Sequence, residues 1–354
     1  MNFFLIHNIQ PNEQLYKHIQ IENLFIPYIS ELHKKYNDND TIIINKTLYK
    51  YLSMIKEQID DRIEQWDKYK KYTNPYEYIH SMIPNTKQSI STLKPISRSF
   101  FKMIEICSTL SLIELLPSDS CKSFHLAEGP GGFIEALVHM RKNPQDTYYG
   151  MTLIDDVNHN VPGWKKSKNF LMNNPNVIIE KGIEGNGDLT KADNLKYCYD
   201  TYNGSMDLIT GDGGFDFTLQ YPNQEKISTR LIMCQIAFAI YFIKPNTSRI
   251  ANSEKYIVCK GFHNINTFEI VKKFYKILST NASIIGSLFN FELPYYFTNK
   301  IEEYNSILGQ QQIDSIVSTI YLIDNTNKYD KIENMKKKNI QKCITWCQKY
   351  DIPY

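Results

Sequence analysis

The chain has 354 residues, 42% hydrophobic and 22% charged, which is enough to bury the core of one large domain or of two domains. Its net charge of +2 excludes a histone-like polycation but permits RNA binding through a local basic patch. The seven cysteines contain no C-x-x-C pair, which predicts packed, reduced thiols rather than a zinc site or a disulfide framework.

The amino-terminal residues lack a basic segment followed by an adequate apolar run, so we expect no signal peptide. No apolar run approaches the length of a transmembrane span, and we therefore expect a cytoplasmic protein with no membrane partner. The composition is rich in Asn, Lys, Ile and Tyr, as an AT-rich genome would produce. The 25 tyrosines are therefore not taken as a base-stacking signal.

Residues 12–71 are predicted to be largely helical, because apolar residues recur at helical spacing among charged ones. A polar run at residues 37–40 divides this region into two segments. Residues 84–96 are predicted to be a loop, and a further helix is expected to begin at Ser99. We therefore predict a helical N-terminal region over residues 1–84.

From residue 121 onward, strands and helices alternate, which predicts an α/β fold. The expected architecture is a Rossmann-like sheet of about seven mainly parallel strands with helices on both faces. The predicted strands cover residues 124–127, 147–154, 176–183, 206–212, 255–262, 283–289 and 315–323. This domain is expected to span residues 85–325, followed by a short helical tail over residues 326–354.

A glycine-rich turn, Glu128-Gly-Pro-Gly-Gly-Phe133, follows the first predicted strand and opens an amphipathic helix. Gly129, Gly131 and Gly132 remove side chains where a ligand must touch the backbone, and Pro130 stiffens the turn. We expect the free amides at the helix start to face that ligand. The turn lacks the G-x-G-x-x-G pattern with a following ribose-binding acid, so dinucleotide binding fits poorly.

Several polar or glycine-rich segments follow predicted strands. They are the glycine turn, Thr152, residues 211–214 and Lys260. In open α/β sheets, ligands bind beyond the carboxyl ends of the strands. We therefore expect these segments to converge on one active site.

Six motifs, in this order, resemble those of the FtsJ/RrmJ-type S-adenosylmethionine-dependent RNA 2′-O-methyltransferases, especially the cap methyltransferase and Adrift-like branch. The motifs are Ser97–Lys102, Glu128–Phe133, Gly150–Leu153, Gly185–Thr190, Asp207–Gly214 and Lys255–Lys260. The resemblance implies a Rossmann-like methyltransferase fold, S-adenosyl-L-methionine as cofactor and RNA as substrate, with the capped 5′ end of mRNA preferred. It also suggests capping-complex proteins as partners. With the AT-rich composition, it suggests a large DNA virus or an AT-rich microbe as source, and hence a cytoplasmic, virion or viral-factory location.

The reaction of that family moves a methyl group to a ribose 2′-hydroxyl, which must lose its proton as it attacks. A lysine removes such a proton only when desolvation and neighbouring cations keep it neutral. The family uses a Lys-Asp-Lys-Glu tetrad. The resemblance assigns Lys102, Asp212 and Lys260 to its first three members, with Lys260 as the general base.

The tetrad glutamate has no clear counterpart. Thr319 stands at the matching position, in the last predicted strand, while Glu254 and Glu292 are the other candidates. Loss of this glutamate is expected to affect the efficiency of methyl transfer more than the type of reaction. It leaves open a catalytically inactive methyltransferase-fold subunit that binds RNA or joins a capping complex. A third alternative is an rRNA 2′-O-methyltransferase.

The resemblance also implies a set of cofactor-binding residues, and no metal. They are Glu128, Gly129, Pro130, Gly131, Gly132, Phe133, Thr152, Asp188 and Asp212. Asp188 corresponds to an acid that contacts the adenosine moiety, or else it shapes the turn before a helix.

Two further features have open interpretations. Trp164 either stacks on a base or a cap guanine, or is a packed loop residue. A set of basic residues either forms a rim that contacts RNA phosphates or is simply solvated. These are Lys165, Lys166, Lys168, Lys244, Arg249 and Lys255.

Overall fold

The computed structural model describes residues 43–155, 157, 161–214, 224–253, 255–259, 272, 274–276, 278, 279 and 295–354. The chain divides into two compact units. The described residues of the first, here called the sheet unit, lie within Pro95–Leu288. Those of the second, the helical unit, lie within His33–Lys94 and Phe289–Tyr354. In the described part of the chain, no helix has the length and apolar character needed to cross a membrane.

Four parallel strands in the order β3-β2-β1-β4 form the body of the sheet. They are β1 Lys122–Leu126, β2 Thr147–Met151, β3 Val177–Glu180 and β4 Met206–Gly211. Leu126 pairs with both Met151 and Gly211, so three strands end level at one edge, here called the carboxyl edge. All six residues of β4 are buried, as expected for a strand covered on both faces. The first four predicted strands and their parallel arrangement are confirmed.

Two further strands complete a six-stranded sheet in the described residues. β5, Ile243–Ser253, is parallel to β4, and β6, Lys255–Cys259, is antiparallel to β5. A strand was expected at the position of β6, but none of the predicted strands covers the residues of β5. The polar run there has no alternating pattern, so only its pairing with β4 reveals the strand.

The direction of β6 corrects one expectation. Cys259 pairs with Arg249, which in turn pairs with Ile209 in the middle of β4. The last residues of β6 therefore do not lie level with the carboxyl edge, where the sequence placed the end of this strand. The predicted strand over residues 283–289 lies outside the described residues.

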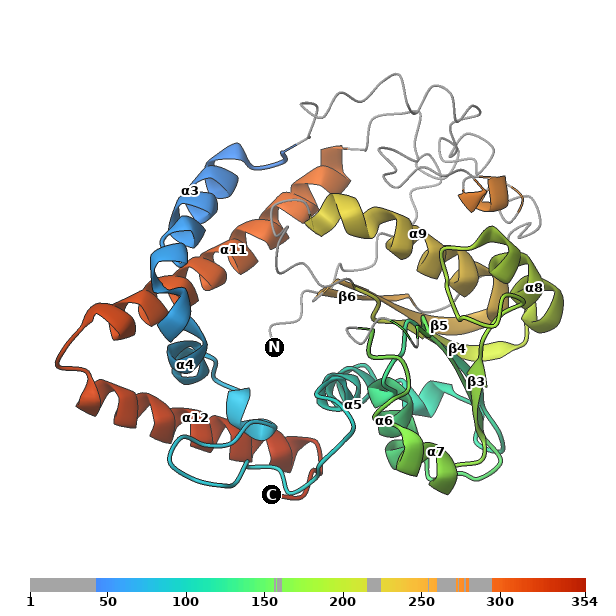
Figure 1. The fold of residues 1–354 in the computed structure, drawn as a ribbon, viewed down its shortest axis with the longest axis horizontal. Coiled ribbons are helices and arrows are strands. Elements are labelled where there is room, and N and C mark those ends of the chain that lie inside the picture. Colours follow the sequence, from blue (N-terminus) through green and yellow to red (C-terminus); the bar gives the residue numbers. More distant parts are fainter. Residues whose placement is uncertain are drawn as a thin grey trace. The chain divides into compact units, whose positions relative to one another are not determined.

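Helices cover both faces of the sheet, as predicted (Figure 1). α5 (Ser99–Thr109) and α6 (Gly132–Arg141) pack together on one face. α8 (Ala192–Tyr202) and α9 (Gln224–Phe242) pack together on the other, and α9 contacts β4 and β5. A short helix, α7 (Lys168–Asn173), precedes β3.

A buried pair of charged side chains stabilises the opposite end of the sheet, here called the amino edge. The Asp146 carboxylate is fully buried and accepts hydrogen bonds from the Arg141 guanidinium, at 2.5 and 2.9 Å. It also accepts bonds from the Tyr148 hydroxyl at 2.9 Å and the Cys121 amide at 2.8 Å. Burial opposes ionisation of Asp146, but these hydrogen bonds outweigh it and hold the pKa of the carboxyl below its ordinary value. The amino ends of β1 and β2 are thereby tied together.

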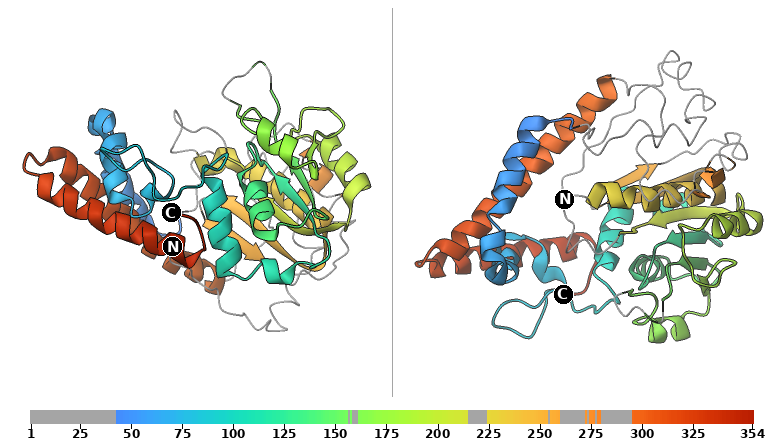
Figure 2. Two further views of the ribbon diagram at one scale, coloured as in Figure 1. Left: turned by 90° about the horizontal axis from the view of Figure 1, so that it is seen from below. Right: turned by 45° about the horizontal axis from the view of Figure 1, so that its top comes forward.

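The helical unit brings together segments from both ends of the chain. Its helices are α3 Lys46–Glu57, α4 Ile63–Thr73, α11 Tyr295–Asp324 and α12 Tyr329–Lys349. α3 runs alongside α11, as two views show (Figure 2). The predicted N-terminal helical region and C-terminal tail thus contribute to one unit, together with residues 295–324. Cys343 and Cys347, predicted to pack, are fully buried in α12.

The predicted strand over residues 315–323 is wrong, because this segment lies within α11. Its run of Ile, Val and Thr resembles a strand in composition. Burial nevertheless recurs at helical spacing, at Ile313, Ile316, Thr319 and Leu322. That stripe packs against α4, where Leu322 joins a cluster with Tyr69.

Candidate active site

The glycine turn joins β1 to α6 at the carboxyl edge. Ala127 has a φ of +53° and Gly131 a φ of +113°, and the second value lies where side chains are rarely accommodated. The Gly131 amide donates to the Glu128 carbonyl at 2.7 Å, which closes the turn. The sequence therefore needs glycine at position 131 for backbone conformation alone.

Glu128 has a role that the sequence analysis did not assign. Its buried carboxylate accepts hydrogen bonds from the amides of Phe133 at 2.8 Å and Ile134 at 3.1 Å. These are two of the helix-start amides that were expected to face a ligand, and they are already satisfied by Glu128. Burial raises the pKa of Glu128 to about 8, with the nearby charge of Asp212 acting in the same direction and the two amides opposing.

The glycines of the turn also make room for the protein itself. A β-carbon at position 132 would collide with the hydroxyls of Ser97 and Ser99, which hydrogen bond to each other. At position 129 it would lie 2.6 Å from the Gly163 carbonyl oxygen. Ser97 and Ser99 belong to the segment that leads into α5, so Gly132 lets this helix approach the turn closely.

Residues 163–167 support the turn from behind. The Ser167 hydroxyl donates to the Pro130 carbonyl, and the Trp164 ring would meet a β-carbon placed on Gly131 or Gly150. Trp164 is thus packed between the turn and β2, which favours the packed-residue interpretation over base stacking. Its indole Nε1 is buried and has no hydrogen-bond partner in the described part of the chain.

Lys102 and Asp212 meet at the carboxyl edge. Lys102 extends from α5, and Asp212 follows the last residue of β4. The Lys102 Nζ lies 4.0 Å from the Asp212 Oδ2, and the two side chains are 28% and 18% exposed. Two residues that are far apart in the sequence therefore form a partly shielded ion pair that solvent and a ligand can still reach.

Gln235 of α9 holds the Asp212 turn and was missed by the sequence analysis. Its Oε1 accepts a hydrogen bond from the Gly213 amide at 3.0 Å, and its Nε2 donates to the Leu231 carbonyl at 3.3 Å. The side chain is 3% exposed and fills the space beside Gly211 and Gly213. A glutamine within an apolar helix gave no sequence signal, because its role depends on the packing of α9 against β4.

Asp188 and Thr152 lie at the ends of neighbouring segments of the same edge. The Asp188 Oδ1 accepts bonds from the Thr190 amide at 2.8 Å and the Thr190 hydroxyl at 2.7 Å, so Asp188 shapes the turn that precedes α8. Thr152 is 8% exposed, and its backbone carbonyl touches Gly187. Arg230 of α9 ties the turn down through the Thr190 carbonyl, at 3.1 Å.

The remaining tetrad candidates have different outcomes. Lys260, Glu254 and Glu292 lie outside the described residues. Thr319 does not stand in the sheet, because it belongs to α11 of the helical unit, where its hydroxyl lies 2.7 Å from the hydroxyl of Thr73. Its match to the family's glutamate is therefore wrong, and this position no longer argues for a missing acid.

The predicted basic rim is described only in part. Lys165, Lys166 and Lys168 are exposed, and the Lys165 Nζ donates to the Val161 carbonyl at 3.0 Å. The side chains of Lys244, Arg249 and Lys255 lie outside the description.

The sequence of the sheet unit matches one known family. Residues 95–241 match the FtsJ-like methyltransferase family, a span that begins where the sheet unit begins and ends in α9. This stretch contains the glycine turn, the Lys102–Asp212 pair and Gln235. It is an FtsJ-like methyltransferase domain.

The chain is also similar in sequence to curated proteins. The chain is 22% identical over 342 residues to the cap-specific mRNA (nucleoside-2′-O-)-methyltransferase 2 of Drosophila melanogaster, covering 80% of this chain and 46% of that protein. It is 30% identical over 173 residues to the human cap-specific mRNA (nucleoside-2′-O-)-methyltransferase 1, covering 38% and 20%. The chain is thus homologous to these enzymes at low identity, and it spans less than half of their length.

One solved structure shows a weak likeness to the chain. A Plasmodium falciparum protein described as a ribosomal RNA methyltransferase shares 17% identity, with 48% of this chain and 99% of that one covered. Its TM-score is 0.33, a likeness too weak to argue from.

Proposed function

We propose that this protein transfers a methyl group from S-adenosylmethionine to a ribose 2′-hydroxyl of RNA, at the 5′ cap of mRNA. The observation that carries the proposal is the Lys102–Asp212 pair, 4.0 Å apart at the carboxyl edge of an FtsJ-like methyltransferase domain. The preference for the cap rests on the names of the curated relatives.

The residues at the carboxyl edge fit this cofactor. When bound, S-adenosylmethionine supplies a methyl group on a positively charged sulfonium. The carboxylates of Asp188 and Asp212 suit a cationic ligand with a nucleoside part. Glu128 would act through the turn, because its carboxylate is engaged with the start of α6.

The reaction asks the protein to align a ribose hydroxyl and to remove its proton. Asp212 holds the ammonium of Lys102 beside the edge, and this pair is suited to orienting the hydroxyl. Lys260 is proposed as the general base on its place in the sequence alone, one residue beyond the end of β6. A cation close to that lysine would help keep it neutral.

The test measures cofactor binding and methyl transfer separately. Lys102→Ala, Asp212→Ala and Lys260→Ala are each expected to lower transfer to a capped RNA oligonucleotide at least about 100-fold. In Lys102→Ala and Lys260→Ala, calorimetric binding of S-adenosylmethionine should persist. Lys196→Ala is the matched control, because this lysine is exposed on α8 and pairs with Asp200.

Other outcomes would redirect the proposal. Cofactor binding without any transfer would favour the inactive subunit of a capping complex. Methylation of uncapped rRNA but not of capped oligonucleotides would reverse the choice of substrate. Transfer that survives Lys260→Ala would remove this lysine as the base.

A further inference from the structure

α12 carries a stripe of lysines along one side. Lys331, Lys338, Lys342 and Lys349 follow one another at spacings of seven, four and seven residues and are all exposed. At about 100° per residue, these spacings place the four lysines within about 40° of arc. The stripe is about 27 Å long at a rise of about 1.5 Å per residue.

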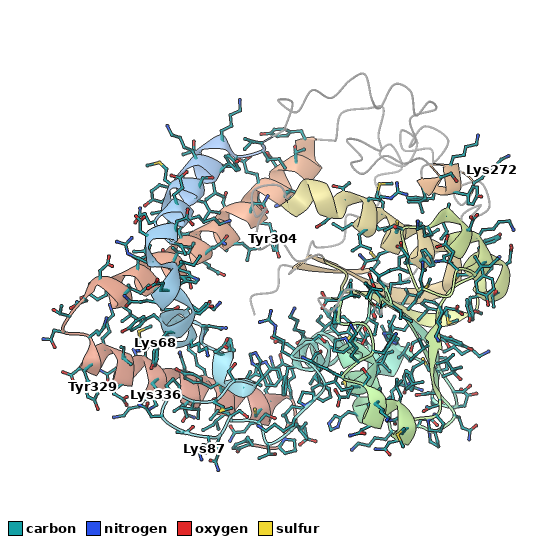
Figure 3. All side chains as sticks on the ribbon, viewed as in Figure 1. Lys68, Lys87, Lys272, Tyr304, Tyr329 and Lys336 are labelled. Carbon is teal, nitrogen blue, oxygen red and sulfur yellow. The ribbon has the colours of Figure 1, made fainter. Side chains whose placement is uncertain are left out.

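Two other lysines of these helices show how a lysine can pair with an acid. Lys336, labelled in Figure 3, lies 3.6 Å from Glu333, and Lys300 lies 2.7 Å from Glu303. Among the described residues, none of the four stripe lysines has an ion pair. The two acids of α12, Asp330 and Glu333, lie about 100° or more away around the helix axis. The four stripe lysines therefore present only positive charge to solvent.

An exposed aromatic ring lies at one end of the stripe. The Lys331 Nζ is 3.7 Å from the centre of the Tyr321 ring, and Tyr321 is 47% exposed. At the other end, the Lys349 Nζ is 5.0 Å from the centre of the Tyr350 ring, which is only 9% exposed and offers no stacking face. Lysines beside an aromatic ring are typical of surfaces that follow a single-stranded nucleic acid.

We propose that this lysine stripe binds the sugar-phosphate backbone of the RNA substrate. The inference rests on the proposed function for the identity of the RNA. Phosphates match a row of exposed ammonium groups in charge. A protein partner fits less well, because protein interfaces are depleted of lysine, and the exposed α12 residues Asn334, Gln341 and Thr345 that flank the stripe are polar.

The stripe belongs to the helical unit, whereas the candidate active site belongs to the sheet unit. The four stripe lysines are therefore not among the residues of the candidate active site, and substituting them leaves Lys102 and Asp212 unchanged.

The test replaces all four lysines together, by Lys331→Gln, Lys338→Gln, Lys342→Gln and Lys349→Gln. Binding of a labelled single-stranded RNA of about 20 nucleotides, longer than one site of this kind, is measured by fluorescence anisotropy over a salt series. We expect the dissociation constant to rise at least about tenfold, and the slope of its logarithm against log salt to fall by about 3, at about 0.7 per phosphate contact. The rate on a minimal capped oligonucleotide should stay within about twofold.

The matched control removes the same charge from other exposed positions of the helical unit, by Lys50→Gln, Lys56→Gln, Lys71→Gln and Lys87→Gln. We expect its salt slope to change by less than about 1. Thermal melts check that both variants are folded, and surface substitutions of this kind are well tolerated.

Two results would overturn the inference. Wild-type RNA binding by the stripe variant shows that the stripe does not contact RNA. Equal loss in the stripe and control variants shows that only net charge matters. Because anisotropy needs no methyl transfer, a protein that fails to methylate but loses RNA affinity with the stripe disproves the proposed function and leaves the inference standing.

Discussion

The two edges of one sheet are built in different ways. At the amino edge, the carboxylate of Asp146 is fully buried and satisfied by Arg141, Tyr148 and a backbone amide. At the carboxyl edge, Asp212 and Lys102 remain partly exposed at a separation of 4.0 Å, and the turns that carry ligand candidates are held from behind. The buried charges of the amino edge connect neighbouring strands. The carboxyl edge carries its charged groups on loops that neighbouring segments support.

We therefore expect residues at the amino edge to contribute mainly to stability, and residues at the carboxyl edge to contribute mainly to activity. At the amino edge, the polar groups already hydrogen bond to one another within the protein, so a substitution there should reduce the free energy of unfolding. Polar groups at the carboxyl edge retain capacity for a ligand, so changes in their supports should reduce activity more than stability. The predictions below test how far this separation holds.

The largest effect is expected at the amino edge. Asp146→Ala leaves the buried Arg141 charge and the Tyr148 hydroxyl without their acceptor. The free energy of unfolding, measured by urea denaturation, should fall by about 3–5 kcal/mol. Asp119→Ala, an exposed carboxylate from the loop before β1, should change it by less than about 0.5 kcal/mol. A loss below about 1 kcal/mol for Asp146→Ala would contradict the role assigned to this edge.

Glu128 should make stability depend on pH at the carboxyl edge. Its pKa in the folded protein is about 8, above the ordinary value of 4.5, so the folded state holds the proton more tightly than the unfolded chain. The stability that it contributes is full below about pH 4.5 and is lost as the pH rises through about 8. Relative to Glu128→Gln, which stays neutral and keeps an acceptor for the two amides, wild type should lose up to about 4 kcal/mol over this range.

Denaturation of both proteins at a series of pH values checks this prediction. The burial of His125, whose pKa is lowered to about 3, is common to both proteins and cancels in the difference. Curves that run parallel from pH 4.5 to 8 would show that Glu128 is ionised throughout.

Gly132→Ala is expected to cost about 1–3 kcal/mol through overpacking, because the new β-carbon would collide with the Ser97 and Ser99 hydroxyls. It should also lower methyl transfer, since α5 carries Lys102. Adding Ser97→Ala and Ser99→Ala removes both hydroxyls and should restore most of the stability and activity. Failure of this rescue would show that the close approach of α5 is not the reason for glycine.

The smallest effect is expected at Gln235. Gln235→Met keeps the size of the side chain but removes the acceptor for the Gly213 amide, which frees the Asp212 turn. We expect kcat to fall about tenfold, equivalent to about 1.4 kcal/mol, with little change in cofactor affinity. Gln235→Glu, which keeps an acceptor oxygen, should retain more activity. A change in KM alone would show that Gln235 does not act through Asp212.

The sequence predicted the parts of this protein that depend on local pattern. Four buried strands and the glycine turn were identified from apolar runs and turn residues, and the motifs indicated that Lys102 and Asp212 would converge. Glu128 capping the helix was also within reach, because an acid just before a helix start is a known signal. Each of these features depends on the residues of a short, continuous segment of the chain.

The remaining features depend on contacts between distant segments. The composition of residues 315–323 favours a strand, yet packing against α4 makes it helical. β5 shows no alternating pattern, and only its pairing with β4 identifies it. The roles of Gln235, Ser97 and Ser99 follow from close approach in the fold, for which a single sequence contains no signal.

The cysteines offer a practical consequence. Six of the seven are buried, and Cys259 is exposed on β6. Burial raises the pKa of Cys107 and Cys234 to about 12 and that of Cys347 to about 11, so their thiolates are scarce near neutral pH. A maleimide dye should therefore attach once per folded chain, on the residue next to Lys260. The native sequence therefore provides a single position, on β6, to which a fluorescent reporter can be attached without any substitution.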